Sequence, residues 1–508
     1  MVSFWRPAAT GVASILAGVG AGELVSSLFA QNGSPVLVVG AAVIDLVPGW
    51  LKEAVISVFG TQDKTVLIVS LALVLLIAGA LAGWLESLRP PVGRILIALG
   101  GALGVLAALT RSGASVLDAV PSAVAAIVAI LVLGALARML RGTAPTRVAP
   151  SGAVSRRRFL VATGATAAGG AIAVAIGQVV SSGYRAAAAA RAAFHLPKAA
   201  VAAPPIPAGA SFDIAGLSPI ITPNADFYRI DTALQIPGID PSTWRLRIHG
   251  LVEDEIELSF AELLKLPLEE SITTLTCVSN EVGGNLISNA TWLGYPIRHL
   301  LARAKPKSNA DMVLSKSQDG WTASTPIEAL TDERNAILAV GMNGQPLPLE
   351  HGYPVRMVVP GLYGYVSATK WVVDLEVTRF DRATSYWTDR GWSQRGPVKL
   401  ESRIDVPAAG RQVTAGTVAI AGVAWSQHVG VSAVHVQIDD GPWEQADIAD
   451  AISVDTWRQW KYAWNAEKGR HTIRVRATDA KGRVQTSAVA DVVPNGATGL
   501  HQISVTVS

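Results

Sequence analysis

The chain has 508 residues, more than one domain usually holds, so we expect about two to four domains. Charged residues make up only 16% of the chain and the mean hydropathy is +0.36, which indicates that part of it lies in lipid. The net charge of +3 is small and no basic stripe with interleaved aromatic residues occurs. This composition argues against a nucleic-acid-binding protein, and no nucleic-acid partner is expected.

Residues 1–150 are predicted to form an N-terminal α-helical transmembrane domain, because the apolar residues gather before Ser182. Four runs near the length of about 20 apolar residues that a bilayer requires occur there, and a fifth follows separately. These runs are Ala8–Ala30, Val66–Leu85, Val92–Thr110, Pro121–Leu140 and Phe159–Val180. The stretch Pro35–Phe59 is apolar but interrupted by charged residues and a proline, which favours a re-entrant or interfacial segment. No histidine precedes His195, so this part holds no bis-histidine haem, and no haem is expected.

The arginines predict how these helices are oriented. Arg89 and Arg94 flank one connection between helices. The arginines between Arg138 and Arg158 flank another. Because positively charged loops stay in the cytoplasm, five spans leave everything after Ser182 on the extracytoplasmic side of a bacterial plasma membrane. We therefore expect a multi-pass protein in contact with membrane lipid, with its C-terminal part outside.

Residues 151–185 are predicted to be an internal twin-arginine signal and anchor helix. The segment Ser155–Leu160 reads S-R-R-R-F-L and precedes a mildly apolar, Ala/Gly-rich run. It resembles the twin-arginine export motif, placed internally. The alternative is that these arginines only keep the loop in the cytoplasm. Because the twin-arginine route carries folded proteins, the motif implies that a cofactor is inserted before export.

Residues 186–210 are an Ala/Pro-rich linker, which predicts a short helix followed by a semi-rigid tether. Residues 211–397 mix strand-like and helical segments with frequent Gly and Pro, an α+β pattern without βαβ regularity. The expected strands are Trp244–Ile248, Met312–Leu314 and Val355–Val359, and the expected helices are Phe260–Leu266, Ile297–Ala304 and Pro326–Leu330. Residues 398–508 carry short alternating strands separated by turns, which predicts a C-terminal immunoglobulin-like β-sandwich. Three of these strands are Thr417–Ala421, Ala433–Ile438 and His471–Ala477.

The single cysteine, Cys277, is the candidate metal ligand. It excludes an intrachain disulfide and a multi-cysteine zinc site. It follows the β-branched stretch Ile272–Leu275 and opens a glycine-rich loop, where a thiolate can approach a cofactor closely. Soft thiolates suit transition metals, but one thiolate cannot hold a metal alone, so the other ligands would come from a cofactor. The alternative, a small buried apolar residue, is the commoner role of a lone cysteine.

The motifs around Cys277 favour its role as a metal ligand over that of a buried apolar residue. The segment Cys277–Gly284 resembles the sulfite oxidase superfamily of molybdopterin enzymes. Further matching segments are Phe227–Arg229, Trp244–Gly250, Trp292–Pro296, Leu300–Leu301, Pro346–Pro348, His351–Arg356, Val359–Gly364, Lys370–Trp371, Gly422–Ser426 and Asp440–Trp443. The resemblance covers about Ser211 to the C-terminus. It implies that Cys277 is the sole protein ligand to molybdenum, that molybdopterin supplies the rest, and that the sandwich forms a homodimer.

The same resemblance implies which residues bind the cofactor. These are Tyr228, Arg229, Ser317, His351, Arg356, Ser367, Thr369 and Lys370. Arg356 supplies a forked cation for the pterin phosphate and Lys370 a point charge. His351 precedes a glycine turn and is expected to donate a hydrogen bond, while Ser367 and Thr369 offer hydroxyl and backbone donors. The alternatives are a structural ion pair for Arg356 and a satisfied loop histidine for His351.

The chain departs from true sulfite oxidases at the positions that bind a small anion. Ile230 stands where one arginine is expected, and no arginine follows Trp425–Val429. The expected tyrosine is replaced within Thr388–Trp392. The region around Phe227 resembles the exported methionine-sulfoxide reductases of the superfamily more closely, so sulfite is not the expected substrate.

These observations predict a membrane-anchored molybdopterin-dependent oxidoreductase. It would catalyse a two-electron reaction, oxygen-atom transfer, on an extracytoplasmic small molecule or sulfoxide. Because the chain contains no C-x-x-C-H motif and no b-type haem domain, the electron partner would be a separate cytochrome or quinone-linked protein. The alternative is a non-catalytic anchored surface protein that binds a ligand through its sandwich. It accounts for the anchor but not for the twin-arginine segment or the exported cysteine.

Mass spectrometry of the metal content separates these two possibilities. The folded wild-type protein, purified from a host that makes molybdopterin, is expected to contain molybdenum close to one atom per chain. A folded protein without the metal would contradict the prediction of an enzyme.

Overall fold

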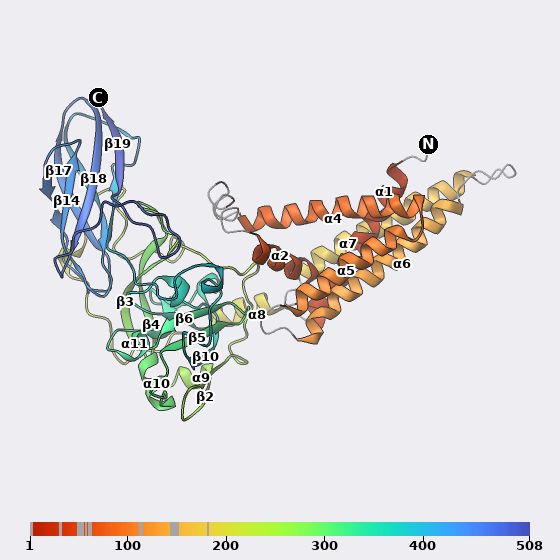
Figure 1. The fold of residues 1–508 in the computed structure, drawn as a ribbon, viewed down its shortest axis with the longest axis horizontal. Helices are drawn as coiled ribbons and strands as arrows, with labels where there is room; N and C mark the ends of the chain where they lie inside the picture. Colours follow the sequence, from red (N-terminus) through yellow and green to blue (C-terminus); the bar gives the residue numbers. More distant parts are fainter. Residues whose placement is uncertain are drawn as a thin grey trace. The chain divides into compact units, whose positions relative to one another are not determined.

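The computed structural model describes residues 4–29, 33–47, 55, 58, 63–110, 115–142, 152–179 and 182–508. The chain falls into two compact units (Figure 1). The first contains Met1–Arg185 and Ala233–Gly238, and the second contains Ala186–Thr232 and Ile239–Ser508. The α+β domain and the sandwich therefore belong to one unit, and the N-terminal helices belong to the other.

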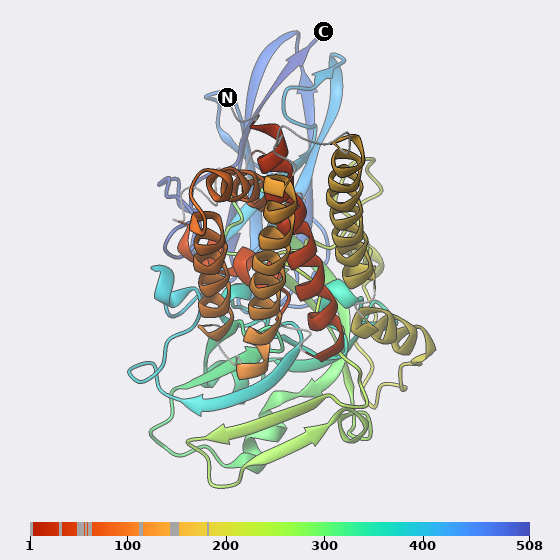
Figure 2. The ribbon, with the colours of Figure 1, turned by 90° about the vertical axis from the view of Figure 1, so that its right-hand side faces the viewer.

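The first unit is helical. Its helices are α1 (Trp5–Phe29), α2 (Pro35–Leu46), α4 (Asp63–Leu88), α5 (Val92–Leu109), α6 (Val120–Gly142) and α7 (Gly152–Val179). Helix α1 packs against α4, α6 and α7, and Figure 2 shows it, in red, running through the group. Glycines bring α1 and α4 into backbone contact, because a Cβ on Gly11 would collide with the carbonyl of Gly79. Small residues at such crossings are typical of helices that associate in lipid.

Four helices of the described residues are long and apolar enough to cross a membrane. They are Trp5–Ser27, Thr65–Leu88, Val92–Leu109 and Val116–Arg141, and they coincide with the first four predicted runs. The fifth predicted run lies in α7, where only the shorter stretch Leu160–Val174 is comparably apolar. The predicted interfacial segment begins with α2, and most of its remainder falls outside the described residues. The backbone of Arg156–Arg158 is helical and belongs to α7.

The α+β domain contains two sheets. One has the order β2-β1-β10-β5-β6, formed by β1 (Arg245–Gly250), β2 (Ile256–Ser259), β5 (Met312–Ser317), β6 (Thr322–Pro326) and β10 (Val372–Thr378). The other has the order β3-β4-β7-β8, with β9 paired to β7, formed by β3 (Glu269–Thr276), β4 (Ile287–Pro296), β7 (Ile337–Met342), β8 (Gln345–Pro346) and β9 (Arg356–Val358). Only β1 and β10 run parallel among these neighbouring strands of the described chain, which agrees with the α+β prediction.

The short helices of this domain follow local sequence rules. Helix α10 (Ile297–Ala304) has the predicted bounds, and it buries Ile297, Leu300, Leu301 and Ala304 at helical spacing. Helix α9 (Phe260–Leu263) begins with a capping box between Ser259 and Glu262. It ends earlier than predicted because Pro267 disfavours helical backbone at the residue before it. Helix α11 (Glu328–Thr331) is also short.

The C-terminal part is a two-sheet sandwich, drawn in blue in Figure 1. One sheet has the order β11-β13-β17-β16, with β11 (Glu401–Val406), β13 (Gly416–Trp425), β16 (Asp447–Ile448) and β17 (Arg458–Ala466). The other has the order β12-β19-β18-β14-β15, with β12 (Gln412–Val413), β14 (Val431–Ile438), β15 (Trp443–Gln445), β18 (Gly469–Asp479) and β19 (Gln502–Val507). Alternate residues of the facing strands, including Trp460, Val434 and Val475, form the core between the sheets.

The linker has the predicted short helix, and the predicted semi-rigid tether after it pairs with the α+β domain. After α8 (Ser182–Ala193) the chain runs along strand β3 of the α+β domain. The amide of Ala200 donates to the carbonyl of Leu268 at 2.7 Å, and the amide of Glu270 donates to the carbonyl of Val201 at 2.8 Å. An open strand edge exposes unpaired backbone groups, and pairing with the linker satisfies them. The linker is therefore part of the domain surface.

The sandwich packs directly on the α+β domain. Val423 and Trp425 of β13 form an apolar cluster with Ile287 of β4. Arg403 of β11 donates to the carbonyl of Gly284 at 2.7 Å and pairs with Asp405 at 2.6 Å. The contact thus reaches the loop that follows Cys277.

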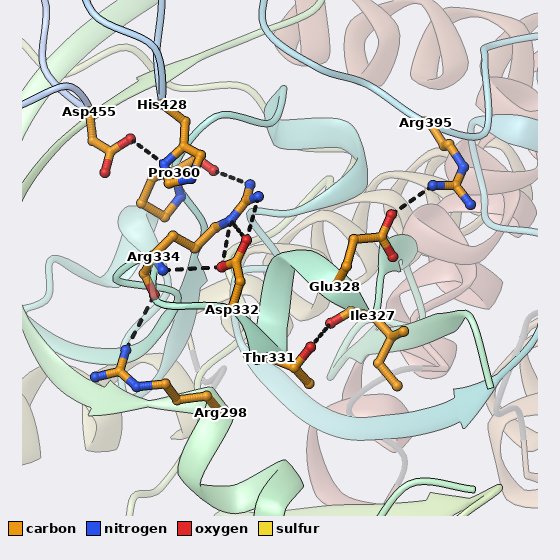
Figure 3. Close-up of polar contacts among 10 residues, drawn as sticks. All are labelled: Arg298, Ile327, Glu328, Thr331, Asp332, Arg334, Pro360, Arg395, His428 and Asp455. Carbon is orange, nitrogen blue, oxygen red and sulfur yellow. Dashed lines mark hydrogen bonds and ion pairs between the residues drawn. The ribbon is translucent and has the colours of Figure 1, made fainter. Parts of the chain in front are cut away.

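Polar side chains of the same two domains also approach each other around Gly361, and the hydrogen bonds and ion pairs drawn in Figure 3 each stay within one domain. Arg334 pairs with Asp332 at 2.8 Å and donates to the carbonyl of Pro360 at 3.0 Å. His428 of the sandwich contacts Asp455 at 3.1 Å. Gly361 lies between the two pairs with a φ of +82°, and a Cβ there would approach His428 Cβ to 3.0 Å. A glycine at this position therefore allows the domains to meet.

The Arg403 contact is expected to stabilise the association of the two domains. Replacing Arg403 by Ala leaves Asp405 buried without its partner, which costs about 3 kcal/mol. We expect the melting temperature of the detergent-solubilised protein, followed by tryptophan fluorescence, to fall by roughly 5–10 °C. The control is Arg247→Ala, which breaks an exposed pair with Glu255 and should leave melting unchanged. Equal melting of both variants would contradict this role.

Candidate functional site

Cys277 lies directly after β3, at the start of the turn that leads to β4. Its amide donates to the carbonyl of Leu286 at 2.9 Å, and its carbonyl accepts from the amide of Asn280 at 3.1 Å. The residue is 8% exposed. Burial raises the pKa of the Cys277 thiol, while donors from Ser279 and the amide of Val278 lower it in part. These donors point at the sulfur and favour a thiolate.

The described residues contain no group of three or more His, Cys, Asp or Glu side chains that could hold a metal. That a cofactor supplies the other ligands of Cys277 stays a prediction.

Tyr228 reaches the end of β3 from a separate segment. Its amide donates to Ser288 Oγ of β4 at 3.1 Å, and its ring stacks on Phe227 at 5.4 Å. A Cβ on Gly364 would lie 3.8 Å from both the Tyr228 hydroxyl and the carbonyl of Thr276. Burial and the nearby Cys277 raise the pKa of Tyr228, and Arg356 opposes them. The structure therefore brings the predicted residues Tyr228, Cys277 and Arg356 together.

Arg356, on β9, is a buried cation without a carboxylate partner among the described residues. Its Nε donates to the carbonyl of Met357 at 3.3 Å, and its Nη1 donates to the carbonyl of His351 at 3.1 Å. The guanidinium lies 5.0 Å from the ring centre of Trp292. Burial lowers the pKa of Arg356 to about 10. A buried guanidinium that lacks a counter-charge is suited to bind an anion. The predicted alternative of a structural ion pair is not observed.

Lys370 and Arg229 share one carboxylate. Lys370 Nζ lies 2.8 Å from Asp231 Oδ2, and Arg229 Nε lies 2.9 Å from the same atom. Burial lowers the pKa of Lys370 to about 8, while Asp231 raises it. Asp231 therefore keeps Lys370 charged near neutral pH.

His351 is held in a neutral form. Burial, with help from the nearby Arg356 and Lys370, lowers the pKa of His351 to about 3. Its Nε2 lies 3.2 Å from the carbonyl of Asn224, so the neutral ring donates its one N–H there. This differs from the predicted donation at the glycine turn. The following Gly352, with a φ of +110°, lies where a Cβ would come within 2.9 Å of Arg356 Cβ.

The predicted hydroxyl groups fall into two classes. Ser367 donates to the carbonyl of Tyr363 at 2.9 Å, and Thr369 shares a hydrogen bond with Ser315 Oγ at 2.7 Å. Both hydroxyls therefore have partners within the protein. The amide of Ser367 also donates to the carbonyl of Gly364, at 3.3 Å, and the carbonyl of Thr369 accepts from the amide of Met357 at 2.8 Å. Ser317 is also buried, but its hydroxyl has no partner among the described residues.

Two regions of the chain match known protein families. Residues 233–387 match the oxidoreductase molybdopterin binding domain family, and residues 401–475 match the bacterial Ig domain family. Mitochondrial sulfite oxidase of Mus musculus is 32% identical over 321 residues, which cover 54% of this chain and 58% of that protein. The protein-methionine-sulfoxide reductase catalytic subunit of Burkholderia mallei is 31% identical over 258 residues, which cover 46% of this chain and 72% of that protein.

The chain belongs to the sulfite oxidase superfamily of molybdopterin-dependent oxidoreductases. It is thus a molybdenum-cofactor oxidoreductase, and the α+β domain is its molybdopterin-binding domain. The prediction of an enzyme is confirmed, and so is that of a C-terminal immunoglobulin-like domain. The chain spans 58% of the length of the mouse sulfite oxidase that it matches.

The residues present fit a molybdopterin. Three buried polar atoms, Thr276 Oγ1, Asn280 Nδ2 and Ser317 Oγ, have no hydrogen-bond partner within the described part of the chain. Such atoms each cost about 1–3 kcal/mol unless a ligand or water pairs with them. Together with the free guanidinium of Arg356, they offer donors and a positive charge to a polar cofactor that carries a phosphate.

Sequence reasoning missed Asp231, Thr276 and Asn280. Asp231 follows the predicted Tyr228 and Arg229 by a few residues, but only the fold shows that it reaches Lys370. Thr276 and Asn280 flank Cys277, and their proximity to it was the available signal.

Asp231→Asn is expected to weaken cofactor retention. Asp231 raises the pKa of Lys370, so its loss moves that pKa down from about 8 and leaves the lysine uncharged near neutral pH. Losing one charge-assisted hydrogen bond weakens binding by roughly 10-fold to 100-fold. Molybdenum and pterin content per chain measure the effect, and retention should recover partly at about pH 6, where Lys370 is protonated again.

The matched control is Asp381→Asn, which removes an exposed carboxylate paired with Arg379. Its cofactor content should equal that of the wild type. The same loss in both variants, or none in Asp231→Asn, would contradict this role of Asp231.

Proposed function

We propose that this chain is a membrane-anchored molybdopterin enzyme that reduces uncharged sulfoxides on the extracytoplasmic side by oxygen-atom transfer. In this proposal Cys277 is the single protein ligand to molybdenum, and Arg356 binds the cofactor phosphate. The bound cofactor supplies the two-electron chemistry.

The remaining predicted residues have supporting roles in this proposal. Lys370 and Arg229 add positive potential next to the phosphate, and Tyr228 and Ser317 donate hydrogen bonds. Thr369 contributes through its backbone amide, because its hydroxyl has a protein partner. Ser367 holds the loop before Lys370 through its bonds to the carbonyls of Tyr363 and Gly364. His351 positions Arg356, since its carbonyl accepts from the guanidinium.

The distribution of charge carries the proposal for the substrate class. Within the described residues, Lys370 and Arg229 share the single carboxylate of Asp231 and Arg356 has none, which leaves a net positive charge at the site. Arg403 and Arg334 of the domain contact have aspartate partners of their own. A cofactor phosphate carries up to about two negative charges, so it would offset the positive charge of the site. A small oxyanion would therefore enter the protein without a counter-charge, which is costly, whereas a neutral sulfoxide needs only hydrogen-bond donors.

The comparisons and the sequence add support. The Burkholderia mallei relative is a protein-methionine-sulfoxide reductase, and this chain covers 72% of it. The arginines expected at two positions in sulfite oxidases are also missing here, and Ile230 stands at one of these positions. Sulfite oxidation is the second candidate, because sulfite oxidases are among the relatives.

The location and the partners are part of the same proposal. The four apolar helices support a multi-pass anchor, and the arginines around Arg89 and Arg156 support an extracytoplasmic catalytic part. A separate cytochrome or quinone-linked protein would deliver electrons one at a time. The sandwich would form a homodimer. Membership of an enzyme family argues against the alternative of a non-catalytic surface protein.

A substrate screen with artificial electron dyes tests the substrate class. With a reduced viologen dye, methyl p-tolyl sulfoxide should be turned over at least about 100-fold faster than sulfite is with an oxidising dye, because an uncompensated anion costs several kcal/mol. Sulfate should not compete. Cys277→Ser should abolish both activities. Efficient sulfite oxidation that weakens with added salt would show that the substrate is an anion.

A further inference from the structure

Glu401, the first residue of β11, is a buried carboxyl with one oxygen unpaired within the described residues. It is 3% exposed, and its Oε1 has no hydrogen-bond partner within the described chain. Burial raises the pKa of Glu401 to about 8, and the nearby Lys399 opposes this only in part. A carboxyl in this state is protonated at neutral pH, unlike an exposed glutamate.

The strand places Glu401 towards the cysteine loop. Side chains two apart on a strand share a face, so Glu401 points to the same side as Arg403. Arg403 donates to the carbonyl of Gly284 in the loop that follows Cys277. Across the sheet, Glu401 is paired with Trp425, which packs on Ile287. Ile287 is in turn paired with Thr276, the residue before Cys277.

Further unpaired polar atoms lie along this contact. Trp425 Nε1, directly opposite Glu401, has no partner among the described residues. The same holds for Gln427 Oε1, whose Nε2 donates to the carbonyl of Thr274 on β3. Buried polar atoms are usually paired with protein or water. Unpaired donors and acceptors along this domain contact therefore indicate a place for water or a polar ligand.

Tyr363 links Glu401 with Cys277. Its amide donates to the carbonyl of Gly396 at 2.7 Å, and its hydroxyl accepts from the amide of Lys399 at 3.4 Å. Burial raises the pKa of Tyr363, and both Glu401 and Cys277 raise it further. The phenol therefore lies within electrostatic reach of both groups.

We propose that Glu401 is the proton-exchanging acid on the substrate side of the cysteine ligand, acting through Tyr363 or water during sulfoxide reduction. This inference rests on the proposed function. In the balanced reaction the S–O bond breaks, and sulfur gains two electrons from an external one-electron donor, which is oxidised. The oxygen leaves as water with two protons. One proton passes through Glu401, whose carboxylate then regains a proton from solvent.

The surroundings of Glu401 suit this exchange. Lys399 beside it and Tyr363 from the packed loop are the titratable groups that interact with it, and Trp425 on the neighbouring strand is not titratable. Arg403, further along β11, is already paired with Asp405. No described cation therefore holds Glu401 as a permanent carboxylate, so it can give up and regain a proton near neutral pH.

Kinetics of the full-length holoenzyme test the proposal. Turnover of methyl p-tolyl sulfoxide with reduced viologen should fall in the wild type as the pH rises through about 8, because Glu401 must carry its proton to donate it. Glu401→Gln keeps shape and hydrogen bonding but carries no exchangeable acid. It should lower kcat by roughly 100-fold and remove this alkaline limb, with KM nearly unchanged. Glu401→Asp should recover part of the rate.

The control is Glu444→Gln, which removes an exposed carboxylate on β15 of the same sandwich and should retain the wild-type profile. Glu401→Gln with normal molybdenum content and melting, but with the wild-type kcat and alkaline limb, would overturn the proposal.

Infrared difference spectra provide a readout independent of turnover. Spectra recorded between about pH 6 and about pH 10 should contain a protonated-carboxyl band that titrates near 8 in the wild type and is missing in Glu401→Gln. A Glu401 that is already ionised at neutral pH would overturn the proposal. If the wild type reduces no sulfoxide, the proposed substrate class is wrong. The infrared titration, and the same pH profile on the substrate that is turned over, then decide the role of Glu401.

Discussion

A single thiolate can serve as the protein's ligand to a metal only if the loop that carries it is held in place. In this chain the cysteine loop is held from two domains. The β3–β4 pairing secures its ends, and Arg403 of the sandwich binds the carbonyl of Gly284 within it. The apolar contact between Trp425 and Ile287 lies alongside. The position of Cys277 therefore depends on the sandwich as well as on its own domain.

The charged groups around the site differ in whether they have a partner of opposite charge. Arg356 is buried without a carboxylate among the described residues, which suits it to bind an anion, whereas Lys370 and Arg229 share the single carboxylate of Asp231. Glu401 represents the opposite case, a buried acid that lacks a cation. Together they agree with the proposal of a cofactor phosphate at Arg356 and an uncharged, hydrogen-bonding substrate. The arrangement is consistent with oxygen-atom transfer, which needs protons but no fixed charge on the substrate.

Several elements were predictable because their causes are local. Helix α10 has the predicted bounds since its apolar spacing and the flanking proline both act within a few residues. The four apolar helices were found from length and composition alone. The contacts of the linker and of the Thr369 hydroxyl could not be predicted in this way. The linker pairs with β3, and Thr369 pairs with Ser315, a residue 54 positions away. No local sequence pattern therefore indicates either contact.

The sequence by itself determined the class of protein and singled out the candidate metal ligand. The chain has one cysteine, and it lies in an ordered series of motifs, so there is a single candidate. The length of each apolar run can be read directly from the sequence. Only the tertiary structure decided which cations are free. Lys370 meets Asp231 across 139 residues and Glu401 faces the cysteine loop through strand pairing, so the net charge of each group depends on neighbours that are distant in the chain. Electrostatic energy depends on distance and burial, and these exist only once the chain has folded.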